Sequence, residues 1–394
     1  MEARRDLNAR GECVRAFSLH PHVYNDTLQC MNMQTGWLAL EDGLVVRGVS
    51  VGAEGISGGE VVFTTGMTGY PEVLTDPSYA GQIVVMSFPM IGTYGISPEW
   101  SESRRPFLRG FVVREASPYT SHWAGRISLS EYLRGHGIVA IAGVDTRRIV
   151  RHLRTHGLRR GVIASGEWDP EELVSRARSL PDLAEEDLVT EVLPEEPLIL
   201  PGPGARIAVL DCGVKMGIAR ELAARGCEVI VLPGLVEVEE ILALRPHALV
   251  VGNGPGDPRR LDVVARRLRT LFGRLPIFGV CLGHQILARA AGATTFKLPF
   301  GHRGCNHPVL EHATGRVRMT TQNHSYAVDE ESLVGTGFVV THRNLHDGTV
   351  EGIRHQHLPV WSVQFHPEAR PGPRDSRDLF DRFLAEVAQH AEVR

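Results

Sequence analysis

The chain has 394 residues, which is more than one hydrophobic core usually serves, so its length predicts two domains. Hydrophobic residues make up 43% of the chain and charged residues 22%, and no apolar run approaches the roughly 20 residues of a membrane helix, so we expect a cytoplasmic protein with no membrane partner. The formal net charge of −4, with arginines scattered among acids, argues against nucleic-acid binding.

The first half of the chain is expected to be rich in strands. Residues 1–35 show no apolar periodicity, and we interpret them as a loose N-terminal extension. From Trp37 the run WLALEDGLVVRGVSVG alternates around Asp42-Gly43, a strong hairpin signal, and EVVFTTGMTGY, GQIVVMSF, FLRGFVVRE and GIVAIAG are also strand-like. Helices are expected near SLSEYLRGHG and from Asp169 to Leu180. Residues 36–184 are therefore predicted to form a β-rich N-terminal domain with some helix.

The second half changes to alternating strands and helices. Residues 185–205 are acidic and proline-rich, break all periodicity, and are predicted to be a linker. From Arg206 the apolar runs RIAVLDCG, CEVIVLPG, HALVVGNGPG and LPIFGVC are separated by the helical segments GIARELAARG, VEVEEILAL and LDVVARRLRTLF. This order predicts an α/β domain over residues 206–394 with a doubly wound, mostly parallel sheet. Ligands of such sheets bind at the carboxyl ends of the strands, where GNGPGDP and GVCLGHQ fall.

Cys281 is the candidate nucleophile. In PIFGVCLGHQIL a strand is expected to end at Val280 and a helix to follow, so Cys281 lies on a sharp turn between Gly279 and Gly283. The N-terminus of the helix favours a thiolate, and the backbone N–H of Leu282 can point at a developing oxyanion. The alternative is a buried structural cysteine, the class to which we assign Cys13, Cys30, Cys212, Cys227 and Cys305.

A thiol nucleophile needs a base, and WSVQFHPEA supplies one. In an extended segment alternate residues share a face, so His366 and Glu368 can point together into a cleft, where the carboxylate would orient the imidazole. Alone, a histidine near a glutamate is a common surface feature. Together with the strand, turn and helix around Cys281, it indicates a catalytic triad.

Nucleotide and metal sites are not expected in this chain. GNGPGDP allows close approach of the backbone to a ligand, but it lacks the GK[ST] of a phosphate-binding loop and is also compatible with a simple tight turn. The six cysteines form no CxxC pair and the 18 histidines no HExxH pattern, so we predict reduced thiols, no metal and no cofactor in this chain.

GNGPGDP, GVCLGHQ, TTQNHSYAV and VQFHPEA, in this order, resemble the class I glutamine amidotransferases. The resemblance covers Arg206 to about His390. It implies that Cys281 is the nucleophile that hydrolyses glutamine through a thioester, with His366 as general acid and base and Glu368 as its orienting carboxylate. It also implies that the backbone at Leu282 and Gly254 stabilises the oxyanion.

The N-terminal half narrows the resemblance. EVVFTTGMTGYPEVLTDPSYAGQIVVMSFPMIGTYG is similar to the small-subunit family of carbamoyl-phosphate synthases, as are FGHRGCNHPV and NHSYAVDE. By this resemblance glutamine is held by Ser78, Gly254, Gly256, Leu282, Gln285, Asn323, Ser325 and Tyr326. Ser325 stands where the family usually has glycine, and its Cβ is expected to restrict the backbone.

The resemblance implies a glutaminase that passes ammonia to a large synthetase subunit. That partner would use bicarbonate and ATP, with the ATP and its metal ions bound on the large subunit, to make carbamoyl phosphate for arginine or pyrimidine biosynthesis. Two alternatives stay open: a stand-alone thiol hydrolase or peptidase, and a catalytically silent scaffold for a partner. The first explains only the C-terminal half, and the intact triad weighs against the second.

Overall fold

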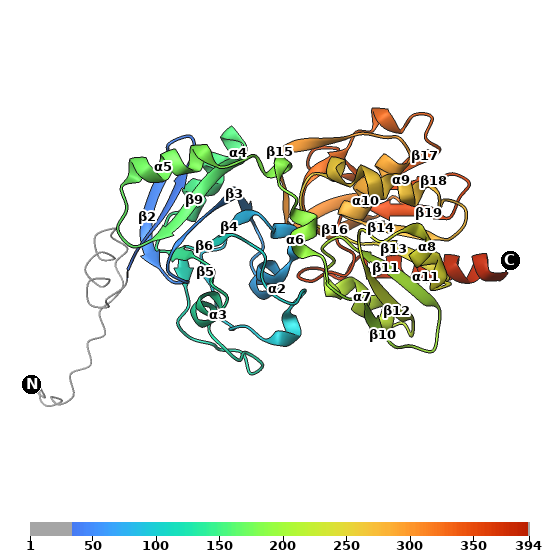
Figure 1. Ribbon diagram of the computed structural model, residues 1–394, viewed down its shortest axis with the longest axis horizontal. Helices are drawn as coiled ribbons and strands as arrows, with labels where there is room; N and C mark the ends of the chain where they lie inside the picture. The colour runs from blue at the N-terminus through green and yellow to red at the C-terminus, as the bar shows by residue number, and fades with distance from the viewer. Residues whose placement is uncertain (1–33, 393–394) are drawn as a thin grey trace, which may run out of the picture. The chain divides into compact units, whose positions relative to one another are not determined.

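The computed structural model describes residues 34–392, so the predicted N-terminal extension lies outside the described residues except for its last two positions. Seven strands close a barrel in the order β1-β2-β8-β6-β4-β3-β9 (Figure 1). Their bounds are β1 Thr35–Leu40, β2 Val45–Ser50, β3 Ile56–Thr64, β4 Gln82–Met86, β6 Gly110–Val112, β8 Ala140–Ala142 and β9 Arg159–Ser165. The predicted hairpin is confirmed, because β1 and β2 pair antiparallel and Gly43 takes a φ of 97° in the turn between them.

Short helices and one small sheet complete the N-terminal half. These elements are α2 Tyr70–Thr75, η1 Pro77–Tyr79, η2 Pro98–Trp100, α3 Leu129–Gly135, α4 Thr146–His156, α5 Pro170–Ser179 and η3 Leu183–Glu185, with β5 Met90–Ile91 pairing β7 Glu115–Ala116. The helices α3 and α5 were expected from the sequence, whereas α4 was not. Its buried side chains are few, and arginines and histidines fill most of its other positions, which obscured the apolar stripe of Ile149, Val150 and Leu153.

A ten-stranded sheet organises the C-terminal half, in the order β10-β12-β11-β13-β14-β19-β18-β17-β15-β16. The parallel strands are β12 Glu228–Pro233, β11 Arg206–Asp211, β13 Ala248–Val251, β14 Ile277–Val280 and β19 Val360–Val363. An antiparallel extension follows, made of β18 Val350–His355, β17 Phe338–Asn344, β15 Thr295–Glu311 and β16 Val317–Val328. The parallel part confirms the predicted α/β fold class, and the antiparallel extension was not anticipated.

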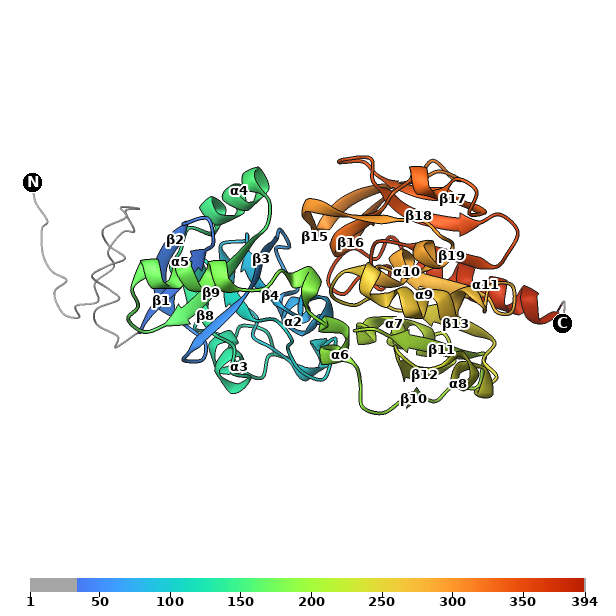
Figure 2. The same ribbon diagram turned by 45° about the horizontal axis from the view of Figure 1, so that its top comes forward.

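Helices cover both faces of this sheet, as a doubly wound fold requires. One apolar core is shared with α8 Val238–Ala243, α9 Asp262–Arg269 and α10 Leu282–Ala290, and the other with α7 Met216–Ala223 and α11 Asp378–Glu392. Figures 1 and 2 both show α9 beside α10. The short helices η4 Pro258–Leu261 and η5 Glu331–Leu333 complete this half. None of the helices within residues 34–392 has the length and hydropathy of a membrane span.

The predicted linker has structure of its own. Within residues 185–205 lie α6 Leu188–Val192 and β10 Leu198–Leu200, and β10 adds an antiparallel edge strand next to β12. The three-residue strand was too short to give a periodic signal between the prolines at 194, 197 and 201. Barrel and sheet belong to one body, Thr35–Arg394, so the predicted domain boundaries stay a prediction.

Candidate active site

Cys281 lies at the end of β14, directly before α10, as the sequence predicts. Its backbone has a φ of 56° and a ψ of −106°, a conformation that non-glycine residues rarely adopt. Two hydrogen bonds hold it there: Cys281 N donates to Val363 O at 2.9 Å, and Gln285 N donates to Cys281 O at 3.2 Å. The sulfur is therefore fixed at the carboxyl end of the parallel strands, and the side chain is only 1% exposed.

The glycines around Cys281 permit close backbone contacts. A Cβ on Gly283 would lie 2.0 Å from the carbonyl oxygen of Val251, so only glycine lets the first turn of α10 rest on β13. A Cβ on Gly254 would lie 2.0 Å from Cys212 O and 2.9 Å from a methyl carbon of Leu282. The two motifs GNGPGDP and GVCLGHQ are therefore in contact in the fold.

His366 and Glu368 follow β19, which neighbours β14 in the sheet. A backbone hydrogen bond from His366 N to Thr321 O, 2.9 Å long, fixes the segment against β16. His366 Nδ1 lies 2.8 Å from Glu368 Oε1, and the two residues are 2% and 1% exposed. The carboxylate is therefore placed to hold a proton on Nδ1 and to orient the ring.

Lys215 is a fourth buried member of this group. It lies at the N-terminal cap of α7, is 1% exposed, and donates from Nζ to Glu368 Oε1 at 2.7 Å. Burial alone would raise the pKa of Glu368, but Lys215 and His366 outweigh burial and lower it to about 2. Glu368 is therefore ionised at neutral pH.

The imidazole of His366 is held in its charged form. Burial alone would lower its pKa, but Glu368, with a smaller contribution from Cys281, raises the pKa of His366 to about 10. Apart from this interaction with the thiol, His366 Nε2 has no hydrogen-bond partner in the described structure. Cys281 Sγ also lies 3.6 Å from Asn323 O. This arrangement can supply a thiolate beside an imidazolium, the state in which a cysteine is a nucleophile and the ring a proton donor.

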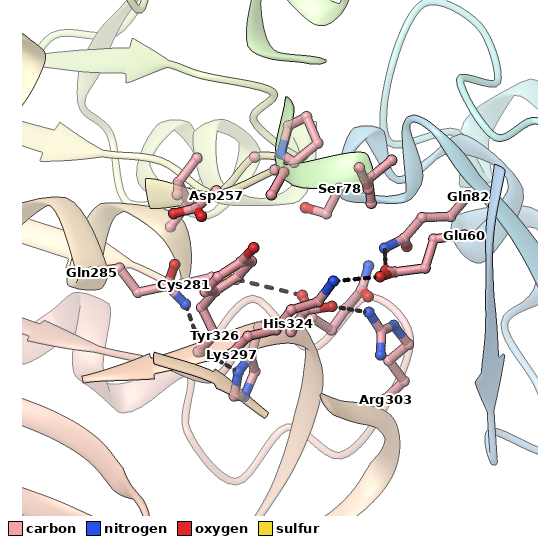
Figure 3. Close-up of a pocket in the computed structure, with 18 residues that line it drawn as sticks. Glu60, Ser78, Gln82, Asp257, Cys281, Gln285, Lys297, Arg303, His324 and Tyr326 are labelled. Atoms are coloured by element: carbon pink, nitrogen blue, oxygen red, sulfur yellow. Dashed lines mark hydrogen bonds and ion pairs between the residues drawn. The ribbon is translucent and has the colours of Figure 1, made fainter. Parts of the chain in front are cut away.

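A pocket opens at Cys281 between the barrel and the sheet (Figure 3). All eight residues that the resemblance assigns to glutamine line it, namely Ser78, Gly254, Gly256, Leu282, Gln285, Asn323, Ser325 and Tyr326. Hydrogen bonds across the two halves of the chain hold these walls: Asn253 Nδ2 donates to Ser78 Oγ at 2.9 Å and Asn323 Nδ2 to Asp76 Oδ2 at 2.8 Å. His366 and Glu368 do not line this pocket; His366 borders a neighbouring one, which Asn323 also lines.

The backbone of Ser325, on β16, does not require glycine. In the described chain the non-glycine residues with positive φ are Arg245, Cys281 and Ala369, so Ser325 adopts a conformation open to any residue. Its Cβ therefore imposes no backbone strain. Its hydroxyl accepts a hydrogen bond from Arg303 Nη2 at 2.5 Å.

Sequence reasoning missed several residues of the site, namely Lys215, Lys297, Glu60, Gln82 and Arg303. One signal was available for two of them. Lys215 and Lys297 are the two lysines of a chain that otherwise uses arginine for its positive charge, and both lie in the site.

One group of described residues has the donor atoms of a metal site. Ligand atoms of His302, His324 and Glu351, all buried, lie within 4.8 Å of one another. His302, however, pairs with Asp347 at 2.8 Å and with Glu351 at 3.6 Å. Burial alone would lower the pKa of His302, but these carboxylates raise it to about 9, and an imidazolium cannot ligate a metal. Both ring nitrogens of His324 are also engaged, so the group is better described as a buried ion pair.

Comparison with known proteins matches both halves of the chain. Residues 38–163 match the family model of the carbamoyl-phosphate synthase small chain, CPSase domain, and residues 208–386 that of class-I glutamine amidotransferases. A carbamoyl phosphate synthase small chain from Symbiobacterium thermophilum is 52% identical over 358 residues, covering 89% of this chain and 98% of that protein. Proteins of the same name from Syntrophotalea carbinolica and Listeria monocytogenes are each 48% identical, and the matches cover 88% of this chain and 96% and 95% of those proteins.

Proposed function

Because this chain belongs to the family of carbamoyl-phosphate synthase small chains, we propose that it hydrolyses the side-chain amide of L-glutamine at Cys281. The observation that carries the proposal is the placement of Cys281. Its sulfur lies in a pocket lined by all eight residues expected to hold glutamine, and its side chain interacts with His366.

In this mechanism the thiolate of Cys281 attacks the carboxamide carbon, and the carbonyl π electrons move onto oxygen. The backbone N–H groups of Leu282 and Gly254 stabilise that oxyanion. As the tetrahedral intermediate collapses, the C–N bond breaks and His366 gives its proton to the leaving nitrogen, which departs as ammonia. His366 then takes a proton from water, whose oxygen attacks the thioester, and glutamate leaves as the thiolate re-forms.

Glu368 and Lys215 act on His366 without touching glutamine. Glu368 keeps the proton on Nδ1 and so leaves Nε2 to exchange protons with the reacting groups. Lys215 neutralises part of the charge of Glu368, which limits the rise in the pKa of His366. Without Lys215, His366 would hold its proton more tightly and would be a poorer acid.

The proposed partner is a large synthetase subunit that consumes the ammonia with bicarbonate and ATP to form carbamoyl phosphate. We propose that ATP and its metal ions bind there, because GNGPGDP in this chain forms a wall of the glutamine pocket and lacks the signature of a phosphate loop. The product would feed arginine or pyrimidine biosynthesis in the cytoplasm, a compartment that suits the free cysteines of the described chain.

The decisive experiment is Cys281→Ser in the complex with the large subunit. Glutamine-dependent synthesis of carbamoyl phosphate should fall by at least about 1000-fold, since serine is a far weaker nucleophile, while synthesis from added ammonia persists. Loss of both activities would contradict the division of labour between the subunits. Glutamine hydrolysis that is equally fast with and without the large subunit would favour the stand-alone hydrolase.

A further inference from the structure

A separate cavity of about 530 Å³ is built around the loop that joins β11 to α7. Its other walls come from residues 98–107 of the N-terminal half, from α6 and β10, and from β12. It shares no lining residue with the glutamine pocket. Its volume is within the range of about 300–1000 Å³ that is usual for sites of small ligands.

Asp211, the last residue of β11, is the buried charge of this cavity. It is 9% exposed, and its Oδ1 accepts hydrogen bonds from Gly213 N at 2.7 Å and Val214 N at 2.6 Å. Within residues 34–392 no group donates a hydrogen bond to its other oxygen, Oδ2. Burial raises the pKa of Asp211, and the two loop hydrogen bonds and the more distant Arg104 offset this rise only in part. The carboxylate therefore lacks a cation.

The other two buried aspartates of the described chain have both oxygens engaged. Asp76 accepts hydrogen bonds from Ser78 N and from Asn323 Nδ2. Asp257 accepts them from the backbone and the guanidinium of Arg259. Partners of this kind are the rule, because a buried carboxylate loses its hydration and needs donors in return. Asp211 departs from the rule at a place where it lines a cavity.

Most of the remaining lining is apolar. The apolar side chains are those of Phe107, Val192, Leu198, Val214, Met216 and Val231. Two arginines also line the cavity, but both already have partners: Arg104 donates to two backbone oxygens, and Arg220 pairs with Glu102. Arg104 is exposed and the side chain of Arg220 is 40% exposed, so water screens their charges more than that of Asp211. The buried end of the cavity therefore favours a cation.

We propose that this cavity is a second ligand site, which takes a small organic cation with an apolar body and holds its ammonium group on Asp211 Oδ2. The ammonium group supplies the missing donor, and the body covers the apolar lining. The site goes beyond glutamine hydrolysis but touches its machinery. Asp211 shapes the loop that carries Lys215, whose Nζ donates to Glu368 at 2.7 Å. An occupant of the cavity therefore contacts the segment that places this lysine.

Calorimetry with three probes of similar size tests the preference for a cation. The probes are benzylamine, which carries an ammonium group, benzyl alcohol, which is uncharged, and benzoate, which carries a carboxylate. In the full chain with Cys281→Ser, benzylamine should bind about 10-fold tighter than benzyl alcohol, as expected of a hydrogen bond to a charged group. Benzoate should bind most weakly, because its charge would meet that of Asp211. Saturating L-glutamine should not displace benzylamine.

Asp211→Asn removes the charge and keeps Oδ1 for the two loop hydrogen bonds. The affinity for benzylamine should fall about 10-fold, to that for benzyl alcohol, which should itself change little. Leu198→Trp gives a second test that does not depend on Asp211. Leu198 lines the cavity from the edge strand β10 and is 44% exposed, so added bulk should weaken benzylamine and benzyl alcohol alike. Ile199→Trp is the matched control, because the next residue is 58% exposed and does not line the cavity.

The proposal is overturned if the three probes bind equally, if none binds, or if Asp211→Asn leaves the affinity for benzylamine unchanged. Displacement of benzylamine by glutamine would place the probe in the glutamine pocket and would also overturn it. The same titration in the complex with the large subunit completes the test. If benzylamine no longer binds there, the cavity receives a basic side chain of the partner and not a small molecule.

Discussion

At the scale of single residues, the site is a row of buried side chains that interact with one another. Lys215, Glu368, His366 and Cys281 form a row in which each member interacts with the next. Each of these three contacts lowers the free energy of the charged side chains relative to an isolated buried charge. Removing one member therefore affects both the stability of the fold and the protonation of its neighbours.

Lys215→Met tests the end of this row. The buried carboxylate of Glu368 would lose its cation, so we expect the free energy of unfolding to fall by about 3–5 kcal/mol and glutamine hydrolysis to slow. Urea unfolding and steady-state glutaminase assays measure the two effects. Arg176→Met in α5 is the control, because the side chains of this arginine and of its partner Glu172 are 50% and 48% exposed and their ion pair should matter little.

The double variant Lys215→Met with Glu368→Gln distinguishes charge from packing. Removing both charges should recover most of the lost stability without recovering activity, since His366 would lack its orienting carboxylate. Stability that stays as low as in Lys215→Met alone would show that the lysine acts through its packing.

The pH dependence of stability tests the charge on His366. Its pKa rises from 6.5 to about 10 on folding, so its contribution is fully present below pH 6.5 and is lost as the pH rises through about 10. The difference in unfolding free energy between the unmodified chain and His366→Asn should therefore shrink between pH 6.5 and 10. Glu368, with a pKa of about 2, stays ionised throughout this range and does not confound the comparison. A difference that is constant across the range would mean that the ring is neutral.

At the scale of elements, the contact between α10 and β13 places the sulfur. Gly283→Ala would bring a Cβ to 2.0 Å from Val251 O, a backbone atom that cannot move aside. We expect the unfolding free energy to fall by about 1–3 kcal/mol. Glutaminase activity should fall as well, because displacing α10 rotates the turn at Cys281. The matched control is Gly135→Ala in α3, where a Cβ meets nothing within 4 Å. There the substitution should leave activity unchanged and raise stability by about 0.5–1 kcal/mol.

The same element shows what sequence could predict and what it could not. The strand, turn and helix around Cys281 are formed by consecutive residues. Gly279, Cys281 and Gly283 therefore predict this geometry directly from the sequence. The hairpin of β15 and β16 is different, because Pro299 and Gly301 interrupt the alternation and the register shifts between Lys297 and His302. Such irregular pairing re-aims side chains in ways that periodicity does not encode. Arg303 and Lys297, which depend on that hairpin, were missed for this reason.

At the scale of the whole molecule, the glutamine pocket is built by both halves of the chain. Of the residues in the N-terminal half that line it, Ser78 of η1 was expected through the family resemblance, whereas Glu60 and Gln82 of the barrel strands were not. Glu60 meets Lys297 across 237 residues of sequence. A contact of that kind depends on how the barrel packs against the sheet, which neither the composition nor the spacing of residues indicates. The site of one half is therefore incomplete without the other.

This dependence can be measured through the pair of Glu60 and Lys297. Their side chains are 6% and 36% exposed and lie 2.7 Å apart, so the pair is partly shielded from water. In a cycle of Glu60→Gln, Lys297→Met and the double variant, unfolding free energies should give a coupling of about 0.5–2 kcal/mol. Each single variant should also raise the KM for glutamine, because Glu60 and Lys297 both line the glutamine pocket and hold each other in place. A coupling near zero, with KM unchanged in both single variants, would show that barrel and sheet hold the pocket without this ion pair.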